Sequence, residues 1–185
     1  PVAGEVFKEG TYEIESERRG YALELAVDFV RMEYTRHRFW EKDDTPVVPL
    51  KSQTLEDVIK TWPQGKINVR ISDYMFRPHQ KWTITAVPDG GGYLGGPYYK
   101  IVIEGTNRAL AATADAEVVT VPEFTGAPEQ LWRIDQLTDG TYRIMPKEVP
   151  GTDKELVLVS VGDSTPSLGE FNMNSDNSKW NFRDH

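Results

Sequence analysis

Apolar and polar positions alternate in short segments along this chain, and several of the segments recur. Residues 82–90 and 132–140 both begin with Trp, carry Ile two positions later and end in Asp-Gly, and Trp180 opens a shorter copy. Residues 10–14 and 140–144 share the phrase Gly-Thr-Tyr-x-Ile. Such alternation predicts half-buried β-strands, and the Asp-Gly pairs predict turns between them. The three tryptophans lie 50 and 48 residues apart, so the pattern predicts three repeats.

Each repeat also contains runs that are typical of strands. Residues 23–27, 116–121 and 156–161 are rich in Leu and Val and fit further strands of the same units. A four-strand unit of about 50 residues that occurs three times predicts an all-β chain with the β-trefoil fold, in which closure leaves no free sheet edge. Another closed or sandwiched all-β fold is the alternative.

We expect one domain over residues 1–185, with repeats at about 10–89, 90–139 and 140–185. The first repeat is longer than the other two, and the extra residues at about 28–66 form an insertion.

The insertion is expected to contain a short helix at residues 54–62. Thr54 is a suitable N-cap with an acidic residue three positions later, and four apolar residues share one face of the helix. Pro63 and Gly65 end it. We expect this helix to pack against the barrel.

Composition and charge narrow the possible functions. The chain has 185 residues, 21 Lys and Arg against 29 Asp and Glu, a net charge of −8 and no cysteine. The acidic balance disfavours nucleic acid and anionic membranes as partners. The lack of cysteine excludes disulfides, thiolate nucleophiles and Cys-ligated zinc. No apolar run is long enough to span a bilayer, and residues 1–5 carry no signal-peptide pattern, so a cytoplasmic or a secreted location is expected.

Signals for catalysis are weak. The three histidines form no metal-binding spacing, and no phosphate-binding loop or nucleophile motif is present. We therefore expect a monomer that is not an enzyme and uses no metal or cofactor.

Basic residues in two places suggest a protease-binding role. Arg31, Arg36 and Arg38 cluster in the insertion of an otherwise acidic chain, and a convex loop that presents Arg suits a trypsin-like primary pocket. Asn107 and Arg108 lie in the loop between the first two strands of the second repeat. Arg108 would suit a trypsin-like pocket, and Asn107 would suit an asparagine-specific cysteine protease. A solvated hairpin and an ordinary turn are the simpler explanations of these two groups.

The chain resembles the mushroom protease inhibitors of trefoil fold, the fungal serine-protease inhibitor family that includes cospin. Residues 9–14, 99–112 and 129–134 carry this resemblance, which covers roughly 5–27 and 68–185. It implies inhibition of a trypsin-like serine protease by substrate-like occlusion, with a loop of the first unit as the inhibitory loop. That loop is the position of the insertion here, so no single arginine can be matched to the family's reactive residue.

Two alternatives to inhibition remain. The Gln-x-Trp copies also resemble ricin-B-like lectins, in which this motif accompanies sugar sites, so a carbohydrate-binding protein is the main alternative. Asp115, Asp163 and Asp176 supply carboxylates, but no repeat pairs one with an obvious aromatic platform. The other alternative is a non-inhibitory interaction protein that docks through the predicted helix.

Overall fold

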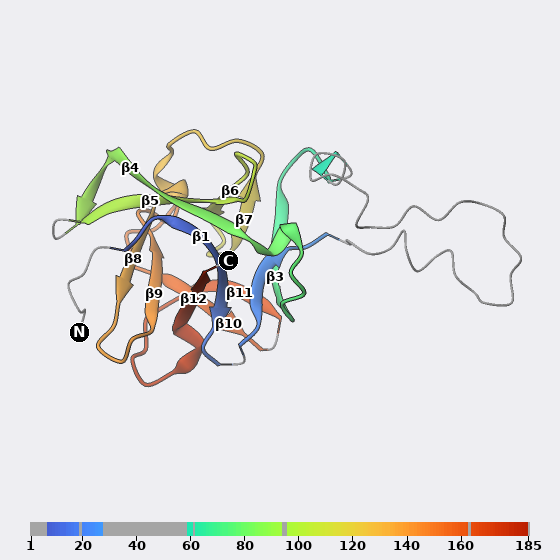
Figure 1. Ribbon diagram of the computed structural model, residues 1–185. Coiled ribbons are helices and arrows are strands. Elements are labelled where there is room, and N and C mark those ends of the chain that lie inside the picture. Colours follow the sequence, from blue (N-terminus) through green and yellow to red (C-terminus); the bar gives the residue numbers. More distant parts are fainter. Residues whose placement is uncertain are drawn as a thin grey trace, which may run out of the picture.

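The computed structural model describes residues 7–18, 20–27, 59–60, 62–93, 96–162 and 164–184. Within these ranges the chain forms twelve β-strands and three short 3-10 turns (Figure 1). The strands are β1 (Gly10–Ser16), β2 (Ala22–Leu25), β3 (Ile67–Ser72), β4 (Trp82–Tyr93), β5 (Gly96–Ile103), β6 (Ala109–Ala112), β7 (Val118–Val121), β8 (Trp132–Gln136), β9 (Tyr142–Pro146), β10 (Val157–Val161), β11 (Thr165–Gly169) and β12 (Trp180–Asp184). The 3-10 turns are η2 (Pro78–Gln80), η3 (Pro128–Gln130) and η4 (Asp176–Ser178).

Most of the predicted insertion lies outside the described residues. Of the helix predicted at 54–62, Ile59 is helical, and the backbone N–H of Trp62 donates to the carbonyl of Ile59 at 3.0 Å. The rest of that helix stays a prediction. No helix in the described part of the chain is long and apolar enough to cross a membrane.

Six strands close into an antiparallel barrel. Strand β1 pairs with β4 and β12, β5 pairs with β4 and β8, and β9 pairs with β8 and β12. Because this ring closes on itself, none of its six strands is left as an open sheet edge.

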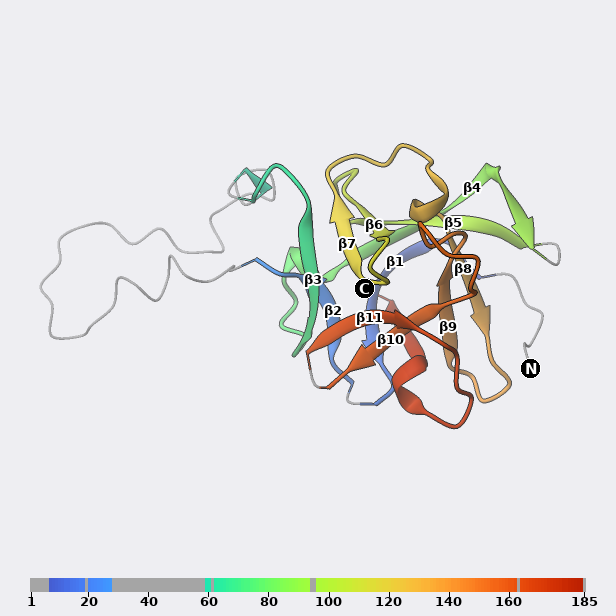
Figure 2. The ribbon, with the colours of Figure 1, turned by 180° about the vertical axis from the view of Figure 1, so that it is seen from behind.

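The other six strands form three hairpins, β2–β3, β6–β7 and β10–β11, and Figures 1 and 2 show barrel and hairpins from opposite sides. The hairpins contact one another. Strand β3 of the first hairpin pairs with β7 of the second. The N–H of Ile71 in β3 donates to the carbonyl of Ser164, just before β11, at 2.9 Å. The N–H of Leu168 in β11 donates to the carbonyl of Ala116, just before β7, at 3.0 Å. A six-stranded barrel with three joined hairpins is a β-trefoil, as the repeats predict.

The three repeated tryptophans hold each hairpin to the barrel. Trp82, Trp132 and Trp180 are fully buried at the starts of β4, β8 and β12. Each indole Nε1 donates a 2.9 Å hydrogen bond to a leucine carbonyl at the same position of a hairpin strand, namely Leu23, Leu110 and Leu158. The Trp of the repeat therefore serves core packing in all three units.

Aromatic rings fill one end of the barrel. Tyr12, Tyr99 and Tyr142 occupy equivalent positions in the first strand of each unit, and the ring of Phe7 lies 5.2, 5.7 and 5.7 Å from their centroids. Phe7 also packs at 4.7 Å against Phe182. The hydroxyl of Tyr99 donates to the Phe7 carbonyl at 2.8 Å, so the segment before β1 is fixed as part of the core.

The first unit contains a buried cluster of charged and polar side chains. Glu24 is only 3% exposed and accepts hydrogen bonds from Arg70 Nε at 2.5 Å and Gln80 Nε2 at 2.7 Å, with His79 Nε2 at 3.5 Å. Burial opposes ionisation of Glu24, but hydrogen bonds from His79, Arg70 and Gln80 outweigh it and hold the pKa of Glu24 below its ordinary value. The carboxylate is therefore kept charged inside the fold.

Candidate functional site

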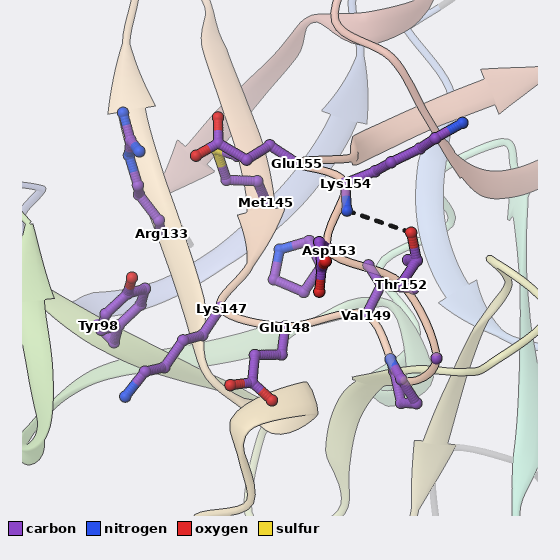
Figure 3. A pocket seen from close by; sticks show the side chains of 13 residues that line it. Tyr98, Arg133, Met145, Lys147, Glu148, Val149, Thr152, Asp153, Lys154 and Glu155 are labelled. Atoms are coloured by element: carbon purple, nitrogen blue, oxygen red, sulfur yellow. Dashed lines mark hydrogen bonds between the residues drawn. The ribbon is translucent and has the colours of Figure 1, made fainter.

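A groove with a mostly polar lining lies beside the loop that joins β9 to β10. The corresponding loops of the first two units, 17–21 and 104–108, have five residues each, whereas residues 147–156 make a loop of ten. This longer loop forms one wall of a cavity of about 570 Å³, and side chains of β5 and β8 complete it (Figure 3). We call this cavity the β9–β10 groove.

A tight turn gives the long loop its shape. The N–H of Thr152 donates to the carbonyl of Val149 at 3.2 Å, and Gly151 between them has a φ of +82°. A side chain would be strained in that conformation, so Gly suits the position. Val149 is buried and anchors the loop to the core, while the N–H of Lys154 donates to Thr152 Oγ1 at 3.2 Å. Hydrogen bonds within the loop and the buried Val149 therefore give the loop a defined conformation, and its polar side chains lie on the outer surface.

Three carboxylates of this loop line the β9–β10 groove. Glu148, Asp153 and Glu155 are exposed, and none of them makes a hydrogen bond or ion pair with another described side chain. Figure 3 shows Glu148 and Glu155 projecting from two separate parts of the loop, on either side of Asp153. Carboxylate oxygens without partners are strong hydrogen-bond acceptors, so the groove can receive a ligand rich in hydroxyl donors.

Strands β5 and β8 supply an aromatic ring and a guanidinium, Tyr98 and Arg133. Lys147, the first residue of the loop, donates from Nζ to the carbonyl of Gly90 at 2.7 Å, and its Nζ lies 5.2 Å from the centroid of the Tyr98 ring. Arg133 Nε lies 2.7 Å from Asp135 Oδ2 in an ion pair, and Arg143 Nε donates to the same oxygen at 2.8 Å. The concave site therefore combines carboxylates, cations and an aromatic ring, so it offers hydrogen-bond acceptors, donors and an apolar contact to a small ligand.

Of the five residues predicted from the sequence to contact a protease, the structure describes only Asn107 and Arg108. Arg31, Arg36 and Arg38 lie outside the described residues, so their role stays a prediction. Asn107 is exposed in the loop between β5 and β6, where its Nδ2 donates to Glu123 Oε2 at 2.9 Å.

Arg108 requires a correction, because its side chain is buried rather than presented to solvent. It is 7% exposed, and its guanidinium donates to the carbonyls of Gly65 and Pro63 at 2.9 and 3.1 Å and to Thr120 Oγ1 at 3.4 Å. In this conformation Arg108 cannot fill the specificity pocket of a protease. The two carbonyls belong to residues 43 and 45 positions away in the sequence, so inspection of the loop alone could not reveal these contacts.

The residues of the β9–β10 groove were not predicted as a site. Two sequence signals could have pointed to it: the third loop is twice as long as its counterparts, and acidic residues flank its Pro-Gly turn. Of the three aspartates considered for a sugar site, Asp115 lies in the turn between β6 and β7, Asp176 lies in η4, and Asp163 is outside the described residues. No group of three potential metal ligands occurs in the part of the chain that the structure describes.

Comparison with known proteins places the chain among trefoil domains. The profile of the family described as ricin-type beta-trefoil lectin domain-like matches residues 78–166. No curated protein matches the chain.

Several solved structures share the fold. The designed threefold-symmetric protein ThreeFoil is 20% identical, with a TM-score of 0.61 over 95% of this chain and 99% of its own. A Polyporus squamosus lectin, solved bound to a human-type influenza-binding epitope, is 16% identical with a TM-score of 0.61, over 96% of this chain and 50% of its own. A mosquitocidal holotoxin is 14% identical with a TM-score of 0.64, over 97% of this chain, which spans only 18% of the toxin. At these identities the likeness shows the fold alone.

Proposed function

We propose that this protein is a carbohydrate-binding trefoil without catalytic activity and that the β9–β10 groove is its sugar site. The observation that carries the proposal is a set of three carboxylates, Glu148, Asp153 and Glu155, which have no partner among the described residues and share a concave site with an aromatic side chain. The match of residues 78–166 to the ricin-type lectin-like family supports a sugar as the ligand.

The chemistry of the groove fits a saccharide. Sugar hydroxyls donate hydrogen bonds, and an ionised carboxylate accepts them more strongly than a neutral group does. Lys154 and Lys147 can donate to ring and hydroxyl oxygens, and the Tyr98 edge offers an apolar contact to the C–H face of a sugar ring. A shallow groove with charged walls binds one or two sugar units rather than a large apolar ligand.

The test is a glycan array followed by calorimetric titration of the best glycan. Glu148→Gln and Asp153→Asn preserve the size of each side chain but remove the carboxylate, and we expect each to weaken binding about tenfold, because a hydrogen bond to a charged group contributes about 1.5–3 kcal/mol. Asp115→Asn is the matched control, since Asp115 is an exposed carboxylate on the β6–β7 turn, outside the groove.

Two results would overturn the proposal. Either the wild-type protein binds no glycan on the array, or both groove variants bind the selected glycan as tightly as the Asp115→Asn control does. Protease inhibition, the function predicted first from the sequence, stays a prediction: the structure offers no exposed arginine from the predicted set among the described residues.

A further inference from the structure

The charged groups of the β9–β10 groove differ in how far the protein already uses them. Every residue that lines the groove belongs to the described ranges, and the lining includes both carboxylates and cations. The carboxylates of Glu148, Asp153 and Glu155 have no hydrogen-bond or ion-pair partner among the described residues. A ligand that enters the groove therefore meets acceptors that the described chain leaves unused.

Two of the cations in the lining are already positioned by oxygen atoms of the protein. The side chain of Arg133 is only 11% exposed, and its Nε lies 2.7 Å from Asp135 Oδ2. Lys147 Nζ donates to the carbonyl of Gly90 and lies against the ring of Tyr98. Neither cation is bonded to a carboxylate of the loop, so the protein itself supplies no partner for those carboxylates from this wall.

The third cation, Lys154, belongs to the loop itself. Figure 3 shows its side chain extending away from those of Glu148 and Asp153, and it makes no ion pair with a described side chain. Exposed charges are screened by salt over about 8–10 Å, so a cation that points away compensates a carboxylate only weakly. In this conformation the carboxylates are the groups of the groove that most lack a partner of opposite charge.

A protonated amino group is the ligand group that best complements such a carboxylate. Hydrogen bonds that involve ionised groups are roughly twice as strong as those between neutral groups, and an ammonium group has three donors. A sugar with an amino group also keeps the hydroxyls and the C–H face that the rest of the groove, including Tyr98, can contact. A sugar that carries a carboxylate of its own would instead be repelled by the loop.

We propose that the β9–β10 groove selects saccharides with a protonated amino group and that Glu148, Asp153 and Glu155 are the acceptors that recognise it. The inference rests on the sugar-binding function proposed above and adds the class of sugar. N-acetylation of the amino group removes its charge and should therefore weaken binding.

Calorimetric titration with two matched series of sugars tests this preference. The first series is the β-1,4-linked disaccharide of glucosamine, N,N′-diacetylchitobiose and cellobiose, which share one backbone and differ at C2. The second is galactosamine, N-acetylgalactosamine and galactose, which covers the other configuration at C4. At low salt and a pH of about 6, we expect the amino sugar of at least one series to bind about fivefold more tightly than its two neutral matches, because exposed ion pairs are individually weak.

The pH dependence has a defined sign. The amino group of such a sugar titrates near the range of an α-amino group, about 7.7–8.0, whereas carboxylates and lysines keep their charge at a pH of about 9. The preference for the amino sugar should therefore disappear between pH 6 and 9, while the affinity for the neutral sugars should stay the same. Added salt should reduce the preference as well.

The ratio of two dissociation constants, neutral sugar over amino sugar, separates recognition of charge from a general loss of affinity. Glu148→Gln, Asp153→Asn and Glu155→Gln keep the shape of each side chain and remove its charge. We expect each single change to lower the ratio and the triple variant to bring it to about one. Asp115→Asn is the matched control and should leave the ratio unchanged, because Asp115 is an exposed carboxylate outside the groove.

Three results would overturn the inference and leave the sugar-binding function in place: neutral sugars that bind as tightly as their amino counterparts, a preference that persists at pH 9, or a triple variant that keeps the wild-type ratio. A glycan array on which only sugars without an amino group bind has the same meaning. If the array and both series show no binding at all, the sugar-binding function itself fails, and this inference fails with it.

Discussion

Replacing each repeated tryptophan by phenylalanine tests whether the three units are held together in the same way. Trp82, Trp132 and Trp180 are all fully buried, and each donates one hydrogen bond of 2.9 Å to a hairpin carbonyl. Phe keeps an aromatic ring in the core but has no donor and is smaller. The change therefore removes one defined bond and a defined volume at three equivalent places.

The expected cost follows from those two losses. The carbonyl of Leu110, for example, is left buried without its donor after Trp132→Phe, which costs about 1–3 kcal/mol. The smaller ring leaves a void of roughly 40 Å³, which adds about 1 kcal/mol at the usual dependence on cavity volume. Each variant should therefore lose about 2–4 kcal/mol of unfolding free energy, within the range that a domain stable by about 5–15 kcal/mol survives.

Urea denaturation followed by circular dichroism measures these differences for the three variants side by side. We expect the three losses to agree within about 1 kcal/mol. If one variant unfolds at the wild-type midpoint, that indole bond does not hold its hairpin, and the reasoning from equivalent geometry is wrong. A matched surface change, Met173→Leu, should have almost no effect, because Met173 is 53% exposed.

Two further predictions concern the barrel end and the buried cluster. Phe7→Ala removes the ring that contacts Tyr12 and Phe182 and should cost about 3–5 kcal/mol in the same denaturation assay; an unchanged midpoint would show that the segment before β1 does not contribute to the core. Because the pKa of Glu24 is lowered in the folded protein, its contribution to stability is present above the pKa of an unfolded glutamate and is lost as the pH falls through the lower, folded value. Glu24→Gln should therefore reduce stability at neutral pH and flatten the acid side of the stability–pH curve; a parallel shift of the whole curve would contradict this.

The core of the fold could be predicted because its determinants lie close together in the sequence. A Trp at the start of a strand, an Ile two residues later and an Asp-Gly turn are local features, and their threefold recurrence indicates three units whose tryptophans bond equivalent positions, as they do at Leu23, Leu110 and Leu158. The side chain of Arg108 was misjudged because it lies in a short polar loop, yet its acceptors are Pro63 and Gly65. Partners that lie more than forty residues apart in the sequence cannot be recognised from the residues next to Arg108.

The buried cluster shows the same limit on prediction. Glu24 lies between two leucines in β2, a pattern that usually places the acid on a solvent face. In this chain it is buried because Arg70 from β3 and Gln80 from η2 cover it. At the equivalent positions the second and third units have Ala111 and Val159, which need no such partners. At this strand position, only the first unit therefore has a charged side chain.

The candidate site lies where one unit departs from the other two. Equivalent tryptophans and tyrosines form a shared core, and positions under that common packing constraint cannot vary independently. The β9–β10 groove exists because one loop has ten residues instead of five. A symmetric trefoil would have three copies of this groove or none. The sugar site that we propose therefore depends on a departure from the threefold pattern, whereas the symmetric residues provide the rigid support that keeps the groove in place.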